Sequence, residues 1–258
     1  MHHGRMFQRI WYNNKRDWPL GVAMNNVLVF DVWGEYAHFR KYYTTTSPLT
    51  FSIPPRTALC GLIAGIIGLD KNDYLKHFTK DKADIAVRII SPTKKVRIAE
   101  NLIDTENIRT LNRIKTRTQI RFEFLKDAKF RIYFRHTDPQ IHNKARDFLE
   151  HHKCVYTPCL GLSEHIANFK FIGEFECRKI EDNNFAEINS AIPIPNGSHV
   201  EIDFEKAGEY FTETLPIEME PDRTVREYTK VAFERKGASI VAKVGSFWEL
   251  NNERIIFL

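Results

Sequence analysis

The sequence predicts an α+β fold: a ferredoxin-like (RRM-like) βαββαβ domain that carries a β-hairpin arm, followed by a smaller β-rich module. Three observations support this prediction. Hydrophobic residues make up 43% of the chain and charged residues 28%, which are globular proportions. Strand-like and helix-like patterns follow one another in the order β-α-β-β-α-β up to about residue 180. Beyond that point, short strand candidates alternate with turns.

The first strand and helix have the clearest patterns. Val27–Trp33 is apolar at nearly every position, as expected for a strand at the centre of a sheet. A polar and aromatic loop over residues 35–55 ends in two prolines, which favour a helix start. We expect a buried helix over Arg56–Leu69. Gly61 and Gly65 share one of its faces and would let the helix approach the sheet closely.

The middle of the chain predicts strands and a basic arm. Asp84–Ile90 alternates like a strand, and Val96–Leu102 continues the sheet. Thr105–Thr118 is basic and lacks a clear period, so we expect a loop or the tip of an arm. Gln119–Leu125 and Lys129–Arg135 flank a Lys-Asp-Ala turn and predict a hairpin with one apolar face and one basic, aromatic face.

The second helix starts at a clear signal. Asp138 is a good N-cap, Pro139 suits the first turn, and the helix is expected to end near His151. The strand Phe169–Cys177 then completes the βαββαβ order. The strands expected in the C-terminal module are Val200–Phe204, Thr224–Phe233, Ala238–Val244 and Arg254–Leu258.

These patterns divide the chain into three parts with uneven charge. We predict an N-terminal extension over residues 1–23, outside the fold, a main domain over 24–180 and the C-terminal module over 181–258. Residues 109–131 hold eight Lys/Arg against two acids, whereas residues 182–222 hold ten acids against one lysine. A basic stretch can meet phosphate and an acidic one can meet solvent or a basic partner, so we expect two faces with different partners.

Several classes of protein are excluded. No run reaches the roughly 18 apolar residues that span a bilayer, and the start of the chain lacks the apolar core of a signal peptide. Two histidines lie near Cys154 and Cys159, but the spacing is not that of a zinc site, and common phosphate-binding and hydrolase motifs are absent. We expect no metal, no cofactor, no membrane contact and a cytoplasmic protein. Its cysteines are expected to be free thiols: Cys60, Cys154, Cys159 and Cys177.

Aromatic and basic side chains gather in two places, the loop after the first strand and the basic stretch. A ferredoxin-like sheet is a common platform for single-stranded RNA, and cations interleaved with rings suit phosphate contacts and base stacking. Each signal also has a structural explanation, because basic edges resist aggregation and adjacent tyrosines often rim a core. The expected RNA-binding residues are Tyr36, His38, Arg40, Lys41, Tyr43, Arg109, Arg113, Lys115, Arg117 and Arg121.

Two other hypotheses remain open at this stage. His38 lies close to Tyr36, Tyr42 and Tyr43 in the sequence, and sets of His, Tyr and Lys can cut RNA by acid–base activation of the 2′-hydroxyl. A metal-independent endoribonuclease that processes precursor RNA is therefore the second hypothesis, although His38 can equally be a loop residue that contacts a base or a partner. A protein scaffold without RNA contact is the third.

Two motif blocks point to a family. They are Asp31-x-x-Gly34, Ala37-x-Phe39-Arg40, Tyr43-Thr-Thr-Thr-Ser-Pro48 and Pro54-Pro55-Arg56-Thr57-x-x-x-Gly61-x-x-x-Gly65-x-x-Gly68, and then Tyr156-Thr157-Pro158-x-Leu160-Gly161-Leu162-Ser163-Glu164. In this order they resemble the fifth Cas family of type I CRISPR systems, and the resemblance covers about Met24 to Leu258.

The resemblance implies a role in a complex. Such proteins are RAMP subunits of the Cascade surveillance complex, with a ferredoxin-like palm, a β-hairpin thumb and a small β-rich C-terminal part. They hold the 5′ handle of the CRISPR RNA, cap the backbone filament, touch the large subunit and the adjacent backbone subunit, and meet target DNA only indirectly. On this basis the thumb would be about residues 96–135, and the loop Tyr36–Tyr43 and Arg56 would lie beside the handle.

The resemblance also bears on catalysis. One branch of the family, in type I-C systems, cuts precursor RNA with Tyr, Lys and His. In the hairpin region this sequence has Arg117-Thr118 and Gln119 with no Lys-His pair, and His136 lies at the far end of its strand. We therefore expect a non-enzymatic member that resembles type I-B.

Overall fold

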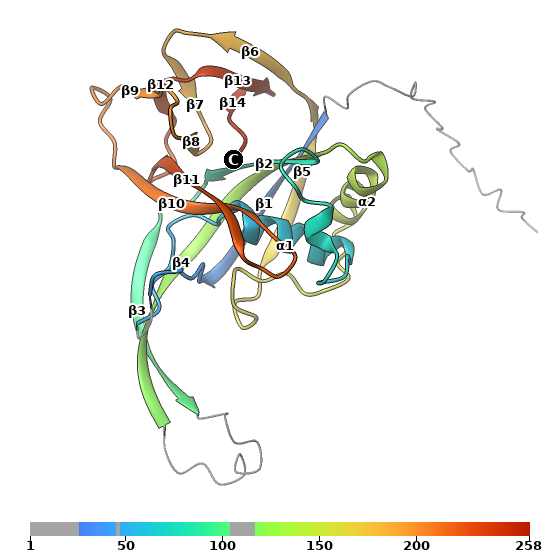
Figure 1. Cartoon of the computed structure of the whole chain (residues 1–258), viewed down its shortest axis with the longest axis vertical. Coiled ribbons are helices and arrows are strands. Elements are labelled where there is room, and N and C mark those ends of the chain that lie inside the picture. The colour runs from blue at the N-terminus through green and yellow to red at the C-terminus, as the bar shows by residue number, and fades with distance from the viewer. Residues whose placement is uncertain (1–25, 45–46, 104–116) are drawn as a thin grey trace, which may run out of the picture.

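A five-stranded antiparallel sheet forms the centre of the computed structural model, which describes residues 26–44, 47–103 and 117–258 (Figure 1). Its strands run in the order β2-β4-β1-β5, and β3 pairs with β4 outside this path. The α+β class is therefore confirmed. The strands are β1 (Asn26–Ala37), β2 (Ala83–Ile89), β3 (Lys94–Ile103), β4 (Arg117–His136) and β5 (Asn168–Glu176).

β1 is apolar at nearly every position between Val27 and Trp33 because both of its faces are buried there. Leu28 and Phe30 point into the large core that includes the helices, whereas Val27 and Val29 point into a second cluster against the C-terminal strands. A strand buried on both faces has no polar side to alternate. The strand predicted from this run is confirmed, and it continues to Ala37, three residues past Gly34.

Two helices pack on the same face of the sheet, and both were predicted. α1 (Arg56–Ile67) ends where Gly68 adopts the left-handed conformation, with φ 72°. α2 (Pro139–Glu150) starts at Asp138, whose side chain accepts a hydrogen bond from the Gln140 backbone N–H at 2.8 Å. In the parts of the chain described here, no helix has the length and apolarity needed to cross a membrane.

The predicted hairpin over 119–135 is wrong, because β4 is one strand of 20 residues. Asp127 does adopt a positive φ of 52°, but the chain does not turn there. β1 pairs along β4 on both sides of this point, from Leu28 opposite Phe134 to Ala37 opposite Leu125, so the ladder holds the strand extended.

The projecting arm is instead formed by β3 and residues 117–126 of β4, which pair from Ile103–Arg117 to Lys94–Lys126. We call this pair of strands the arm. Figure 1 shows the arm extending away from the body of the protein. The candidates Arg109, Arg113 and Lys115 and the N-terminal extension over residues 1–23 lie outside the described residues.

The C-terminal third is β-rich, as predicted, and forms three small sheets, β10-β11-β8, β7-β12-β9 and β14-β13-β6. The four predicted strands correspond to β9, β11, β12 and β14. The bounds are β6 (Arg178–Asp182), β7 (Ala186–Ile188), β8 (Ile192–Ile194), β9 (Glu201–Ile202), β10 (Tyr210–Met219), β11 (Val225–Glu234), β12 (Ile240–Lys243), β13 (Gly245–Leu250) and β14 (Glu253–Ile255).

This C-terminal part shares its core with the first part of the chain. Leu215 and Ile217 of β10, and Val231 and Phe233 of β11, belong to the same buried cluster as the apolar residues of α1. The apolar surface that α1 turns away from the sheet is thus covered in part by β10, which fixes β10 and β11 beside the helix.

A buried histidine on α2 makes the fold sensitive to acid. His142 is completely buried, and its Nε2 lies 3.2 Å from Oε1 of Glu174. Burial lowers the pKa of His142, and the neighbouring carboxylate of Glu174 only partly offsets this. A histidine whose pKa is lowered in the folded state binds protons preferentially in the unfolded state, where its pKa is about 6.5, so acid favours unfolding.

We expect the free energy of unfolding to fall as pH drops from about 7.5 to about 5.5, a window above the titration of ordinary carboxylates. Urea denaturation at several pH values measures this. His142→Gln should reduce the pH dependence by up to about 1.4 kcal/mol per pH unit. His38, His136 and His165, whose pKa values burial also lowers, contribute to the remainder. An unchanged slope in the variant would show that His142 takes up no proton on unfolding.

Candidate nucleic-acid interface

Basic side chains collect on one side of the arm. Residues directly opposite each other in an antiparallel ladder point to the same side, so the pairs Arg97–Glu123, Ala99–Arg121 and Ile103–Arg117 share one side. Arg97, Arg117 and Arg121 are exposed there. Glu123 is the one acid on this side among the described residues, and its carboxylate lies 3.9 Å from Nε of Arg97. Arg117 and Arg121 form no ion pair with the described residues.

The other side of the arm has an apolar middle. It carries the pairs Val96–Phe124 and Ile98–Phe122, and Ile98 is exposed. The rings of Phe122 and Phe124 stack with their centroids 5.7 Å apart, and Phe124 is buried against the body. The pair Lys94–Lys126 lies on this side at the base of the arm, and Glu100 lies on it nearer the tip. The arm therefore presents exposed arginines to one side, and to the other it presents aliphatic and aromatic groups flanked by these charged residues.

His38 lies in the interior, where little of its surface is available for the predicted contact with RNA. The residue is 2% exposed, and its ring is flanked by Phe122 and Phe124, with centroids 5.7 and 5.6 Å away. Its Nδ1 lies 2.8 Å from the carbonyl oxygen of Glu123. Burial lowers the pKa of His38, so a neutral ring donates to this carbonyl. The histidine thus joins the end of β1 to the arm.

Arg56 is also buried, at 1% exposure, so little of its surface is available for the predicted contact with RNA. Its guanidinium donates to the carbonyl oxygens of Ala83 at 2.6 Å, Ile217 at 3.2 Å and Thr79 at 3.3 Å. These acceptors come from three different segments of the chain. Arg56 is therefore a structural residue that connects the start of α1, β2 and β10.

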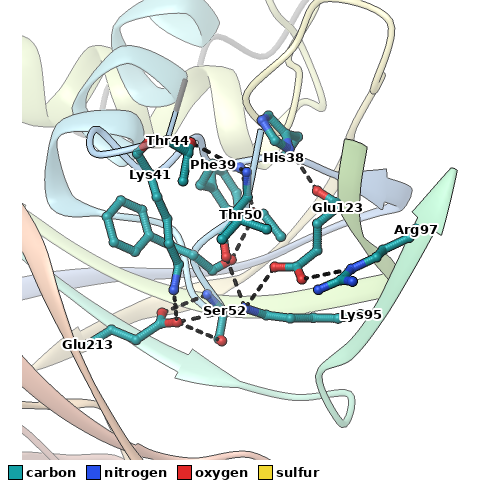
Figure 2. A network of polar contacts seen from close by, with 12 residues as sticks. His38, Phe39, Lys41, Thr44, Thr50, Ser52, Lys95, Arg97, Glu123 and Glu213 are labelled. Carbon is teal, nitrogen blue, oxygen red and sulfur yellow. Dashed lines mark hydrogen bonds and ion pairs between the residues drawn. The ribbon is translucent and has the colours of Figure 1, made fainter. Parts of the chain in front are cut away.

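A polar network holds the loop after β1 in place (Figure 2). Glu213 of β10 accepts hydrogen bonds from Nζ of Lys41 at 2.9 Å, from the backbone N–H of Ser52 at 2.7 Å and from its hydroxyl at 3.1 Å. Nζ of Lys95, on the arm, donates to the carbonyl oxygen of Thr50 at 2.9 Å and lies 3.3 Å from Oε1 of Glu123. The network therefore links the loop, the base of the arm and the C-terminal part.

Lys41 belongs to this network and is not a free surface cation. Its side chain and that of Glu213 are each 13% exposed. Burial alone would lower the pKa of Lys41, but the hydrogen bond and the charge of Glu213 raise it above its ordinary value. Lys41 therefore stays protonated and paired, and its predicted role in RNA binding competes with this ion pair.

We expect Glu213→Gln to lower the free energy of unfolding by roughly 1.5–3 kcal/mol, because hydrogen bonds to a charged and largely buried carboxylate are lost. Urea denaturation measures the change. The matched control is Glu187→Gln, which breaks an exposed ion pair with Lys206 and should cost less than about 1 kcal/mol. Equal costs for the two variants would mean that the Glu213 network does not stabilise the fold.

Three exposed tyrosines form a cluster beside this network. Tyr42 is 58% exposed, Tyr43 60% and Tyr228 of β11 39%. The ring centroids of Tyr42 and Tyr43 are 5.1 Å apart, and those of Tyr42 and Tyr228 are 4.7 Å apart. We call these residues the tyrosine cluster. Exposed rings of this kind offer stacking surfaces for unpaired bases.

The predicted site residues thus differ in how far they are exposed. Arg40, Tyr43, Arg117 and Arg121 are exposed, whereas Tyr36 is half-buried, with Nζ of Lys126 5.4 Å from the centre of its ring. Tyr228 could not be predicted as part of this surface, because only the folded chain brings β11 next to the loop. Exposed cations on the arm and exposed rings on the loop, joined by one polar network, are groups that can bind single-stranded nucleic acid.

Comparisons with known proteins give a family from the sequence and a similar fold from a solved structure. The family model described as "CRISPR-associated protein (Cas_Cas5)" matches residues 27–234. The fold is similar to that titled "Crystal structure of a CRISPR protein from Archaeoglobus fulgidus", with a TM-score of 0.53, 12% identity and coverage of 89% of this chain and 98% of that chain. A chain of a "CRISPR RNA-guided surveillance complex" gives a TM-score of 0.47 with 13% identity, covering 89% and 92% of the two chains. No curated protein matches the sequence. Because the family model spans well over half of its residues, the chain belongs to the CRISPR-associated Cas5 family.

Proposed function

We propose that this chain is a CRISPR RNA-binding subunit of a type I Cascade surveillance complex, in which it holds the 5′ handle of the guide and caps the backbone filament in antiviral defence. The observation that carries the proposal is the exposed basic side of the arm, with Arg97, Arg117 and Arg121. Arginines at a surface bind phosphate in bidentate fashion and release counterions from RNA. The tyrosine cluster supplies rings for bases that are not paired.

The fold supports this role. An antiparallel sheet ordered β2-β4-β1-β5, with α1 and α2 packed on one face, is the arrangement expected of a ferredoxin-like RAMP palm. The arm then corresponds to the thumb, and β6–β14 to the small C-terminal part. On this view the thumb is built from β3 and β4, and not from the hairpin that the sequence suggested.

The two-sided arm also supports contacts with other subunits. Its apolar side exposes Ile98 and Leu102, which are suited to a protein partner. We propose that this side meets the adjacent backbone subunit, that another face meets the large subunit, and that target DNA is met only indirectly. Membership of subtype I-B is part of the same proposal.

We further propose that the chain does not cut RNA. His38 was the candidate general base, and its burial between two phenylalanine rings supports a structural role. Incubation of the purified protein with precursor repeat RNA in EDTA tests this. The RNA should stay intact. A cut at one site that is abolished by Tyr43→Phe would instead favour the metal-independent endoribonuclease.

Binding of a repeat-derived 5′-handle RNA tests the proposed function itself. Fluorescence anisotropy across a range of salt concentrations should show that the logarithm of the association constant falls linearly with the logarithm of the salt concentration, by about 0.7 per phosphate contact. Affinity for the handle should exceed affinity for a scrambled RNA of equal length. No binding, or binding that does not respond to salt, would contradict the proposal.

A further inference from the structure

A cavity lies along α1, away from the arm. It consists of two adjoining hollows of about 310 and 540 Å³ that share Gly61, Gly65, Tyr74 and Arg223 in their walls. We call it the α1 cavity. Thr157, from the second family motif, lines it as well, so two sequence motifs meet there. Cavities of roughly 300–1,000 Å³ are typical of small-molecule sites.

The floor of the α1 cavity is bare helix backbone. The expectation that Gly61 and Gly65 let α1 approach the sheet is wrong, because a Cβ added at Gly65 would meet nothing within 4 Å. A Cβ at Gly61 would meet only the Tyr74 hydroxyl, at 3.7 Å. Because Gly61 and Gly65 lie one turn apart, the face of α1 toward the cavity has no side chain at these two positions. This leaves a flat surface that can accept a planar group.

Polar residues surround this floor. Thr57, Thr157 and Arg223 line the cavity, and the hydroxyl of Tyr74 lies near Gly61. Tyr156 and Lys71 line its outer hollow. A mostly apolar cavity with a few convergent polar groups is the usual composition of a ligand site.

We propose that the α1 cavity binds a nucleotide, with the base on the Gly61–Gly65 floor and the phosphate beside Arg223 and Lys71. A flat floor suits a base, and the Tyr156 ring is exposed for stacking. The two cations of the outer hollow outnumber its one acid, Asp70, and this excess of positive charge suits a phosphate. The nucleotide comes either from solution, as a free mononucleotide, or from the end of a bound RNA. The second source rests on the proposed function, and the first does not.

One substitution should block ligand binding in the cavity without destabilising the fold. Gly65→Leu fills the cavity, and it should not lower the melting temperature, because leucine favours helix over glycine and its Cβ has free space. Asn143→Leu is the matched control, since it adds the same side chain at an exposed position of α2. Arg223→Gln removes the cation without changing the floor.

Calorimetric titration with AMP, GMP, CMP and UMP tests the free source. Crosslinking of a short RNA with 4-thiouridine at its first nucleotide, followed by peptide mapping, tests the RNA source. We expect either binding of a mononucleotide or a crosslink from the RNA to the peptide that contains Tyr156. The observed signal should weaken at least about fivefold in Gly65→Leu and in Arg223→Gln, and it should be unchanged in Asn143→Leu. The proposal is overturned if the wild-type protein shows neither signal, or if filling the cavity leaves both unchanged. If RNA binding is lost in the arm variants, while Gly65→Leu leaves both the mononucleotide titration and the crosslink unchanged, this proposal alone is overturned and the proposed function stands.

Discussion

Replacing Arg56 with alanine is expected to lower the free energy of unfolding by at least about 3 kcal/mol. Three carbonyl oxygens, those of Ala83, Ile217 and Thr79, would lose their donor, and each buried acceptor left unpaired costs roughly 1–3 kcal/mol. The guanidinium is 1% exposed, so water cannot easily replace it unless the site opens. Urea denaturation followed by circular dichroism measures the loss.

The control for this prediction is Arg146→Ala on α2, which removes a partly exposed arginine that lies 3.2 Å from Glu174. That variant should lose no more than about 1 kcal/mol. If Arg56→Ala proves as stable as the control yet loses RNA binding, the structural role given to Arg56 is mistaken and the original prediction of an RNA contact is right.

Charge reversal on the arm should have the largest effect on function. Changing Arg97, Arg117 and Arg121 together to glutamate removes three phosphate contacts, which should reduce the salt slope of RNA binding by about 2. At about 0.1 M salt, a slope change of this size corresponds to roughly a hundredfold weaker binding. Anisotropy titrations of the 5′-handle RNA at several salt concentrations give both numbers.

A matched variant separates the arm from overall charge. Lys144, Lys153 and Lys179 are exposed cations away from the arm, and their joint change to glutamate alters the net charge by the same amount. This variant should keep most of its affinity and nearly all of its salt slope. Equal losses in the two triple variants would mean that net charge, and not the basic side of the arm, attracts the RNA.

The core elements could be predicted because their signals are local. β1 has an apolar run broken only by Asp31, α1 starts after two prolines and ends at a left-handed Gly68, and α2 starts at an Asp138 cap. Each of these signals lies within a few residues of the element that it controls. Tertiary contacts then reinforce the local preference, and the boundaries agree within a few residues.

β4 shows where local signals fail. Lys-Asp-Ala followed by a second alternating run predicts a hairpin, and Asp127 does take up a turn-like φ. The strand nevertheless continues, because β1 supplies ladder partners on both sides of Asp127 and the hydrogen bonds outweigh the local preference. No pattern within the segment reveals which distant strand will pair with it.

The site residues were harder to predict than the fold, because residue type does not determine burial. Arg56 and His38 have the chemistry of RNA-binding residues, yet both are buried and hydrogen-bonded to backbone carbonyl oxygens. Arg56 donates to carbonyl oxygens of β2 and β10, and His38 donates to one at the base of the arm. The contacts of Tyr228 and Glu213 with the loop could not be predicted, because these residues reach the loop only through the packing of β10 and β11. Arg117 and Arg121, on a projecting arm, keep the exposure that their sequence context predicted.

The most direct test of the central claim is the position of the guide RNA in the assembled complex. Photocrosslinking of a guide that carries reactive nucleotides along its 5′ handle, followed by peptide mapping, identifies the protein groups in contact with each nucleotide. The account predicts crosslinks from the handle to the arm, at peptides that contain Arg97 or Arg121, and to the loop that carries Tyr42 and Tyr43. Crosslinks of the handle to other subunits alone, with none to this chain, would contradict it.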